Sequence, residues 1–378
     1  MALSFDPYSE DFDAASQIWA DVVPVHQDDG PNPLCPIMYS PDYSKAMDLL
    51  RALLPRGELS LRALQLTKHL ATLNASSYTV WAWRAKILSA DDDHSQGGLG
   101  VKEDRLRREL EWLDDLSNSI SLKNYQVWQH RRQILTMQLR PDLSKELAFT
   151  AEIFKDDAKN YHTWAYRAWL VSHFGMTRVA AAEQPAATTY IDEIWNAELA
   201  FTSELIADDA RNNSAWNHRW LVLFGSAWAR SQGAGRYVGA DLEHVVTNES
   251  NFAQSHIARM PHNQSAWTYL RGLVKLAPSS NAYAPHADLA RQMLTQVRSS
   301  QEDTGAPLIE CPPALEWLLD EATARLDVAT ALDLLYRLAK ADPIRRKMWD
   351  WRGKMIQRNA AGGVGLQSGP APARVTAS

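Results

Sequence analysis

Cysteine is scarce in this chain, because only Cys35 and Cys311 among its 378 residues carry a thiol. Two cysteines cannot build a disulfide framework, and they cannot supply the ligands of a Cys-rich zinc site. Small secreted proteins usually depend on several disulfides, so this count favours a reducing compartment. We therefore expect an intracellular, cytoplasmic protein.

Long apolar runs and a surplus of basic residues are also missing. The first twenty residues contain acids and no apolar core, so we expect no signal peptide. No apolar run approaches the ~18 residues of a membrane span, and we expect no membrane insertion. Lys and Arg number 39 against 45 Asp and Glu, a formal net charge of −6. Nucleic acids attract basic surfaces, so this balance argues against a nucleic-acid partner.

Tryptophan, in contrast, is abundant, with 15 residues. Five of them occupy a repeated frame, Asn-x-x-x-Trp-x-x-Arg, at Trp81, Trp128, Trp164, Trp216 and Trp267. A looser sixth copy ends the series at Trp349, while Ser77 replaces the Asn of the first copy and Leu270 the Arg of the fifth. Repeats of this length predict tandem copies of one supersecondary unit.

The frame has the features of a helix start. Asn is among the best N-cap residues, because its side-chain oxygen accepts from the free N–H groups of the first turn. Apolar residues recur with helical spacing after the frame, as over 216–227, and before it, as over 143–154. Each copy therefore predicts a helical hairpin that stacks on its neighbours. Since no segment shows a sustained period of two, we predict an all-α chain.

We predict three regions along the chain: an extended, proline-containing N-terminal segment over 1–40, a helical-hairpin repeat domain over 41–358, and a disordered tail over 359–378. Stretches containing Gly, Ser, Ala or Gln are predicted as loops that lengthen individual hairpins, at 91–102, 175–190 and 225–241. The composition of these inserts indicates no function for them.

Several segments extend the pattern beyond the bare frame. They include WADVVPVHQDDGPNP (19–33), YSPDYSKAMDLLRALL (39–54), DAKNYHTW (157–164), DARNNSAW (209–216) and PHNQSAWTYLRG (261–272). From about residue 19 to about residue 358, the chain resembles the alpha subunit shared by protein farnesyltransferase and type I protein geranylgeranyltransferase, the CaaX prenyltransferases.

This resemblance implies a right-handed superhelical α-solenoid crescent, wrapped around a catalytic beta subunit. In the family the beta chain binds zinc and most of the isoprenoid, and magnesium accompanies the diphosphate. The implied reaction is transfer of a farnesyl or geranylgeranyl group to the Cys of a C-terminal CaaX motif, in proteins such as Ras-type GTPases. A thioether forms and diphosphate leaves. The isoprenoid length would be set by the beta chain, and from its own residues we expect no metal site in this chain.

The resemblance also assigns one catalytic residue and six substrate-binding residues, all near the starts of repeat helices: Lys123 for catalysis, and Tyr78, Tyr125, Gln126, Asn160, Tyr161 and His162 for substrate. Lys123 would reach the diphosphate leaving group, and Gln126 the CaaX carboxylate. Without the resemblance, a lone Lys before a helix is usually a solvated residue. The frame Asn residues are caps first, and the tryptophans are core residues.

Two other functions stay open. One is a Rab-type geranylgeranyltransferase alpha subunit, and the other is a helical-repeat scaffold without catalytic role, since a fold alone does not specify a function. We expect structural roles for His130 and His218. We also expect the frame arginines to pair with acids of adjacent hairpins or of a beta chain; these are Arg84, Arg131, Arg167, Arg219 and Arg352.

Overall fold

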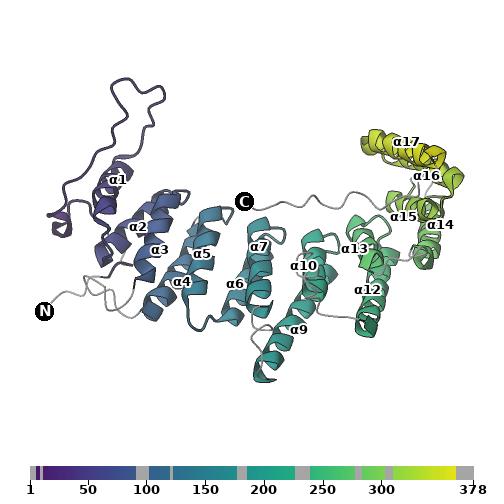
Figure 1. Cartoon of the computed structure of the whole chain (residues 1–378), viewed down its shortest axis with the longest axis horizontal. Helices are drawn as coiled ribbons and strands as arrows, with labels where there is room; N and C mark the ends of the chain where they lie inside the picture. Colours follow the sequence, from purple (N-terminus) through teal and green to yellow (C-terminus); the bar gives the residue numbers. More distant parts are fainter. Residues whose placement is uncertain are drawn as a thin grey trace. The chain divides into compact units, whose positions relative to one another are not determined.

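The fold is helical wherever it can be described. The computed structural model describes residues 6–8, 12–90, 102–119, 122–176, 185–225, 239–276, 283–302 and 310–362. No strand occurs in these ranges, which confirms the all-α prediction. The chain forms two compact units, Met1–Phe174 and Gly175–Ser378, and in each of them successive helices pair as antiparallel hairpins (Figure 1).

The described part of the first unit contains seven α-helices and carries every residue of the predicted site. Its helices are α1 (Pro41–Leu53), α2 (Leu61–Leu73), α3 (Tyr78–Ser89), α4 (Lys102–Ser119), α5 (Tyr125–Met137), α6 (Leu143–Asp156) and α7 (Tyr161–Leu170). Helix α7 continues into a π-helical segment, Val171–Met176. Among the helices of the described ranges, none is both long and apolar enough to cross a membrane.

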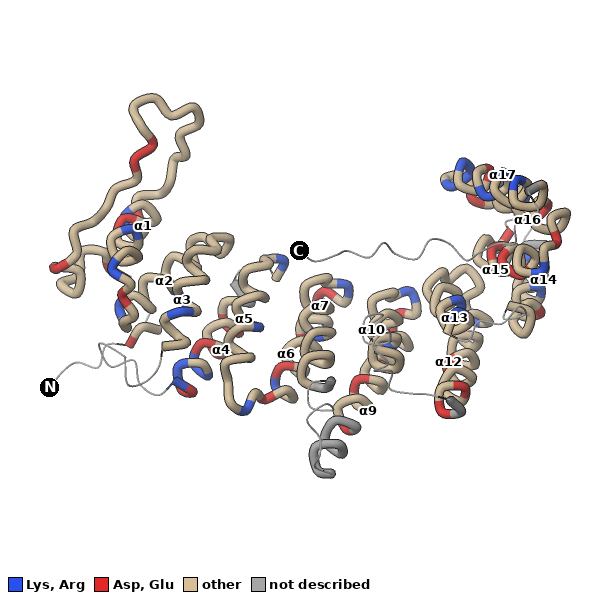
Figure 2. The backbone as a smooth tube through the Cα atoms, viewed as in Figure 1, with Lys and Arg blue, Asp and Glu red and all other residues tan. Residues whose placement is uncertain are grey.

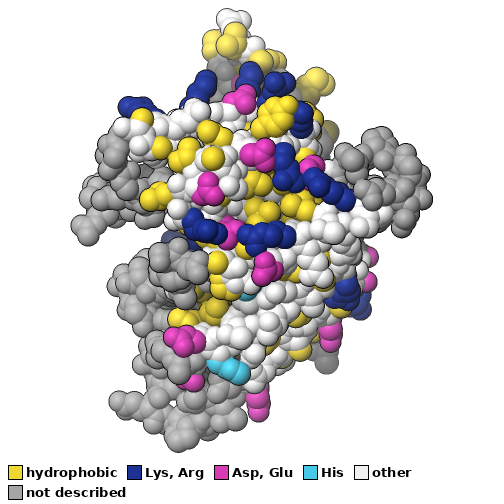
Figure 3. Space-filling model, turned by 90° about the vertical axis from the view of Figure 1, so that its right-hand side faces the viewer, with side chains coloured by type: hydrophobic (Ala, Val, Ile, Leu, Met, Phe, Trp, Pro, Cys, Tyr) yellow, Lys and Arg dark blue, Asp and Glu magenta, His cyan; other side chains and the backbone are white. Residues whose placement is uncertain are grey.

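The second unit continues the hairpin pattern. Its helices are α9 (Pro185–Asp208), α10 (Asn213–Phe224), α12 (Gly239–Arg259), α13 (Gln264–Leu276), α14 (Ala287–Glu302), α15 (Pro312–Ala324), α16 (Val328–Ala341) and α17 (Arg346–Gly362). Its surface mixes exposed apolar residues such as Trp351 with Lys, Arg and acidic side chains, as Figure 3 shows for one face.

The asparagines of the frame are N-caps, as predicted. The side-chain oxygen of Asn124 accepts from the backbone N–H groups of Gln126 at 2.8 Å and Val127 at 3.3 Å. Asn160 and Asn212 cap α7 and α10 in the same way. These bonds satisfy backbone donors that the first helical turn leaves free.

The frame tryptophans are buried, and each one also fixes the turn before its helix. In five copies the indole Nε1 donates to the backbone carbonyl six residues earlier, over 2.7–2.9 Å: Trp81 to Ala75, Trp128 to Leu122, Trp164 to Ala158, Trp216 to Ala210 and Trp267 to Pro261. The ring therefore packs in the core while its polar atom is satisfied by the turn.

Buried glutamates join consecutive hairpins. Glu109 on α4 accepts two hydrogen bonds from Arg84 on α3, at 2.7 and 2.6 Å, and lies 2.7 Å from His130 Nε2 on α5. The arrangement recurs at Glu146 with Arg131 and Tyr166, and at Glu249 with Arg219 and Tyr269. The prediction that frame arginines pair with acids of adjacent hairpins is confirmed at these positions.

The electrostatics of this contact favour an ion pair. Burial alone would raise the pKa of Glu109, but the Arg84 guanidinium and the His130 hydrogen bond lower it to about 2. Burial lowers the pKa of His130. The Glu109 carboxylate is therefore charged at neutral pH, and the structural role expected for His130 is confirmed.

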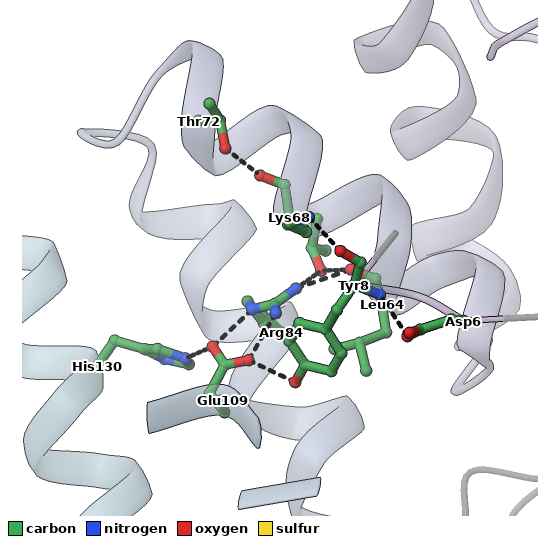
Figure 4. A network of polar contacts seen from close by, with 9 residues as sticks. Asp6, Tyr8, Leu64, Lys68, Thr72, Arg84, Glu109 and His130 are labelled. Atoms are coloured by element: carbon green, nitrogen blue, oxygen red, sulfur yellow. Dashed lines mark hydrogen bonds and ion pairs between the residues drawn. The ribbon is translucent and has the colours of Figure 1, made fainter. Parts of the chain in front are cut away.

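The N-terminal residues Asp6–Tyr8 reach the same cluster (Figure 4). The Tyr8 hydroxyl donates to Glu109 at 2.8 Å, and Lys68 Nζ donates to the Tyr8 carbonyl at 2.7 Å. The sequence predicted an extended segment over 1–40, and the structure differs from this prediction at one place. Residues 17–19 form a turn of 3-10 helix whose Trp19 is buried, because an aromatic ring this large gains more by packing than by exposure.

Helix boundaries differ from the predicted loops and tail at three places. Helix α9 begins at Pro185, helix α12 at Gly239, and helix α17 runs on to Gly362. Alanine, which the prediction read as a loop residue, is the strongest helix former, and proline suits a first turn. The insert 91–102 lies outside the described residues except for Lys102, which begins α4. Residues 177–184, 226–238 and 363–378 also lie outside them.

The Glu146 contact allows a stability test. In the variant Glu146→Ala, Arg131 and Tyr166 would lose a buried partner, so we expect the free energy of unfolding to fall by about 3–5 kcal/mol. Urea unfolding of the full-length chain, followed by tryptophan fluorescence, measures this loss.

A matched control lies on the same helix. Glu152 forms an exposed pair with Lys155, and Glu152→Ala should change the unfolding free energy by less than about 1 kcal/mol. Equal changes of the unfolding free energy in the two variants would show that the buried glutamate contributes no more to stability than an exposed ion pair.

Candidate active site

Three parallel helices of the first unit begin at one common edge. Helix α3 contacts α5, and α5 contacts α7 (Figure 1). Each is the second helix of its hairpin, so all three run in the same direction and begin at the same edge. The Asn124 amide donates to the Ser76 hydroxyl at 3.3 Å, which ties the turn before α5 to the turn before α3. All seven predicted site residues lie at these three helix starts.

Three tyrosines mark this edge. Tyr78, Tyr125 and Tyr161 are each the first residue of their helix, and their exposed fractions are 73%, 68% and 69%. Rings with this exposure contribute little to the core of their own chain. They are available to contact another molecule.

His162 joins the starts of α5 and α7. Its ring meets Tyr125 edge to face with the centroids 4.4 Å apart, and Tyr161 is 5.5 Å away. Partial burial lowers the pKa of His162, and the positive charge of Lys123 lowers it further. The imidazole is therefore neutral near neutral pH, and Lys123 lies within electrostatic reach of it.

Lys123 itself is an exposed residue directly before the N-cap Asn124. A cation at this position opposes the dipole of α5, so the arrangement is favourable only when an anion is near. Together, the positive dipole ends of the three helices and the Lys123 ammonium make an edge suited to a phosphate or a carboxylate.

The remaining predicted residues take different positions. Gln126 is half-buried on the first turn of α5, and its side chain has no hydrogen bond to the described residues. Asn160 is only 3% exposed, and its oxygen accepts from the backbone of His162 and Thr163. Its side chain therefore caps the start of α7.

A metal ion requires a set of closely placed ligand side chains. Across the described ranges, no three His, Cys, Asp or Glu side chains gather closely enough to hold a metal ion. The buried Cys311 thiol donates to the Pro261 carbonyl, and burial raises its pKa to about 11. These residues do not fit a zinc site.

One positioning residue was missed by the sequence. Ser76, which accepts from Asn124, belongs to the turn of the preceding repeat, 48 residues away. No pattern in the frame marks it, because serine is common in turns and its partner is distant in sequence.

Comparison with known proteins shows which family the chain resembles. The pattern of the "Protein prenyltransferase alpha subunit repeat" matches residues 106–138, 143–174, 195–225 and 246–277. The protein farnesyltransferase/geranylgeranyltransferase type-1 subunit alpha of Dictyostelium discoideum is 32% identical over 345 residues, covering 89% of this chain and 92% of that protein. Its Pisum sativum counterpart is 34% identical over 357 residues, covering 90% and 94%.

A solved structure agrees with these relatives. A chain of Candida albicans protein geranylgeranyltransferase-I complexed with GGPP superposes with a TM-score of 0.68 at 26% identity, over 91% of this chain and all of that one. The helical hairpins and the polar edge thus define a protein prenyltransferase alpha subunit, and the chain belongs to that family. Its nearly full-length matches are to type-1 subunits. The Bos taurus type-2 subunit alpha is 28% identical, and the match covers only 45% of that protein.

The proximity of Lys123 and His162 can be tested without an activity assay. In the variant Lys123→Ala the pKa of His162 should rise, because a nearby positive charge disfavours the imidazolium. NMR titration of the histidine ring protons in the full-length chain measures this pKa, with His162→Gln to assign the signal.

Lys159 provides the control. It precedes the cap of α7 as Lys123 precedes the cap of α5, yet its charge does not contribute to the lowered pKa of His162. Lys159→Ala should therefore leave that pKa in place. An unchanged pKa in Lys123→Ala would mean that the two side chains are not neighbours.

Proposed function

We propose that this chain is the alpha subunit of a heterodimeric protein prenyltransferase of the farnesyltransferase/geranylgeranyltransferase type-1 class. The observation that carries the proposal is the edge where Lys123, Tyr125 and His162 meet, in a chain that matches type-1 alpha subunits over nearly their whole length. In the reaction a cysteine thiolate attacks C1 of the isoprenyl group, the C1–O bond to the diphosphate breaks, and a thioether and free diphosphate result.

Lys123 would act on the leaving group. As the C1–O bond lengthens, negative charge grows on the diphosphate, and a fixed cation stabilises that charge more in the transition state than in the bound substrate. The position before the α5 N-cap suits this role, since the ammonium and the helix dipole then favour the same anion.

The aromatic and amide groups would position the substrates. Tyr78, Tyr125 and Tyr161 offer exposed rings for an isoprenoid or a peptide, and the neutral His162 can donate one hydrogen bond. The Gln126 amide, half-buried beside them, would donate to the carboxylate that ends a CaaX peptide. Asn160 would contribute indirectly, by fixing the start of α7.

The remaining chemistry would come from a partner. Because the described residues do not fit a zinc site, we assign zinc to a beta subunit, together with most of the isoprenoid pocket and the choice between farnesyl and geranylgeranyl. Magnesium would accompany the diphosphate. The protein substrates would be CaaX-terminated proteins such as Ras-type GTPases, in the cytoplasm.

The two alternative functions have less support. A Rab-type subunit would be expected to match type-2 proteins along more of their length than this chain does. A scaffold without catalytic role would not need Lys123, so the variant described next also discriminates against it.

The substitution Lys123→Ala tests the catalytic assignment. Loss of one preorganised charged group costs on the order of 10²-fold in rate, so kcat should fall by about that factor while isoprenoid affinity changes little. Lys123→Arg should recover only part, because the planar guanidinium directs its hydrogen bonds at fixed angles. The measurement is single-turnover transfer from labelled isoprenoid diphosphate to a CaaX peptide, by the heterodimer with its beta subunit.

Lys159→Ala is again the matched control, and its rate should stay within about 3-fold of wild type, well short of the roughly 10²-fold loss. Gel filtration shows that each heterodimer is intact. A loss of less than about 3-fold in Lys123→Ala, against that same expectation, would make Lys123 an ordinary surface lysine.

A further inference from the structure

An extended arm leaves the first unit between the buried Val22 and the start of α1 (Figure 1). We define the arm as residues 23–40, all of which are exposed. Two of its apolar side chains are almost fully exposed, Leu34 at 100% and Met38 at 98%, and Ile37 between them is 64% exposed. Scattered apolar residues are normal on surfaces, but three within five residues of a projecting segment indicate an interaction site.

The arm is nevertheless built to hold one shape. At its base, the Val25 N–H donates to the Asp48 carbonyl at 3.1 Å, and Arg51 Nε donates to the Val25 carbonyl at 2.9 Å. At its turn, the Gly30 N–H donates to the Asp28 side chain at 2.9 Å, with Gly30 at a φ of +73° that favours glycine. Four prolines of the arm fix further backbone angles, at Pro24, Pro31, Pro33 and Pro36.

Stiffness and exposure together point to binding. A preorganised segment loses little conformational entropy when it is bound. Little of the free energy gained by its apolar contacts is therefore spent on ordering the segment, and most of it contributes to the affinity. The same exposed side chains would gain nothing for the isolated chain, because they touch no core of its own.

Charge decides which kind of partner fits. The arm contains Asp28 and Asp29 and no Lys or Arg, and Figure 2 shows red but no blue along it. Anionic membranes and nucleic acids both attract basic segments, so neither is a suitable partner. A protein surface with an apolar groove is the partner that matches an acidic, apolar arm.

The position of the arm identifies that protein. Successive helices are antiparallel, so α1 begins at the same edge of the first unit as α3, α5 and α7 (Figure 1). A subunit that brings its reactants to Lys123 must approach this edge and therefore also meets the arm. We propose that the arm docks into an apolar groove of the zinc-carrying partner subunit and holds it over the candidate active site. This inference rests on the proposed function.

The test is the affinity of the full-length chain for its beta subunit. In the double variant Leu34→Ser, Met38→Ser, the dissociation constant should rise by on the order of 10²-fold. The lost burial of each apolar side chain should by itself raise the constant at least tenfold. Neither side chain packs in the fold, so the variant should unfold like wild type. Leu139→Ser is the control: Leu139 is 86% exposed just after α5 ends, at the opposite edge, and its substitution should leave the affinity unchanged.

Transfer rates separate this inference from the proposed function. At saturating beta subunit the assembled double variant should transfer the isoprenyl group at the wild-type rate. If the variant weakens assembly but the wild-type heterodimer transfers nothing, the docking role stands and the catalytic proposal fails. A dissociation constant within about 3-fold of wild type, where on the order of 10²-fold is expected, would overturn the docking role. A slower rate with unchanged affinity would likewise overturn it, by showing that the arm contacts substrate.

Discussion

At three places in the described residues, the carboxylate of a buried glutamate holds two neighbouring hairpins together. Glu109 accepts two hydrogen bonds from Arg84 in the hairpin before it and lies against His130 in its own. A charge removed from water in this way is tolerable only when its partners meet it with good geometry. The contact therefore permits one register between hairpins, and sliding by a turn would leave both charges buried and unpaired. Burial of the tryptophans stabilises the fold without favouring one relative position of the hairpins. The hydrogen bonds of the glutamates determine that relative position, because they depend on direction.

The candidate active site depends on that register. Its residues come from α3, α5 and α7, so their distances are set by how the helices stack and by no direct chain connection. The tryptophan Nε1 bonds fix the turns that precede these helices, and the asparagine caps fix their first residues. Lys123 and His162 are brought together in this way across 39 positions of sequence. Most site residues are exposed, while the tryptophans that fix the preceding turns are buried.

Local chemistry explains what the sequence could and could not predict. The frame predicted helix starts, caps and buried tryptophans, because these depend on a few adjacent residues. It predicted acidic partners for the arginines but could not name Glu109 or Glu146, since those contacts join separate hairpins. A signal for them exists: Tyr166 and Tyr269 each bond a glutamate 20 residues earlier, as does His218 with Glu198. The early starts of α9 and α12 were missed because alanine was read as a loop residue.

For the site itself, the residue types came from the resemblance, and their placement needed the fold. The resemblance assigned Asn160 to substrate binding, and the structure adds that its oxygen caps α7 while its side chain is only 3% exposed. Ser76 and the docking of Tyr8 on Glu109 join positions far apart in sequence, which periodicity cannot reveal.

The hydrogen bonds of the tryptophan Nε1 atoms also restrict the length of the turns at one edge of the hairpins, whereas the connections at the opposite edge vary in length. The turns before α3, α5, α7, α10 and α13 are four or five residues long, whereas the segments that join one hairpin to the next vary from five to fourteen. The turn length varies by only one residue where the indole must reach a carbonyl six residues back, and it varies widely at the opposite edge. Fluorescent labels, affinity tags or whole inserted domains placed at that opposite edge would thus lengthen the chain without moving the lysine and tyrosines of the site.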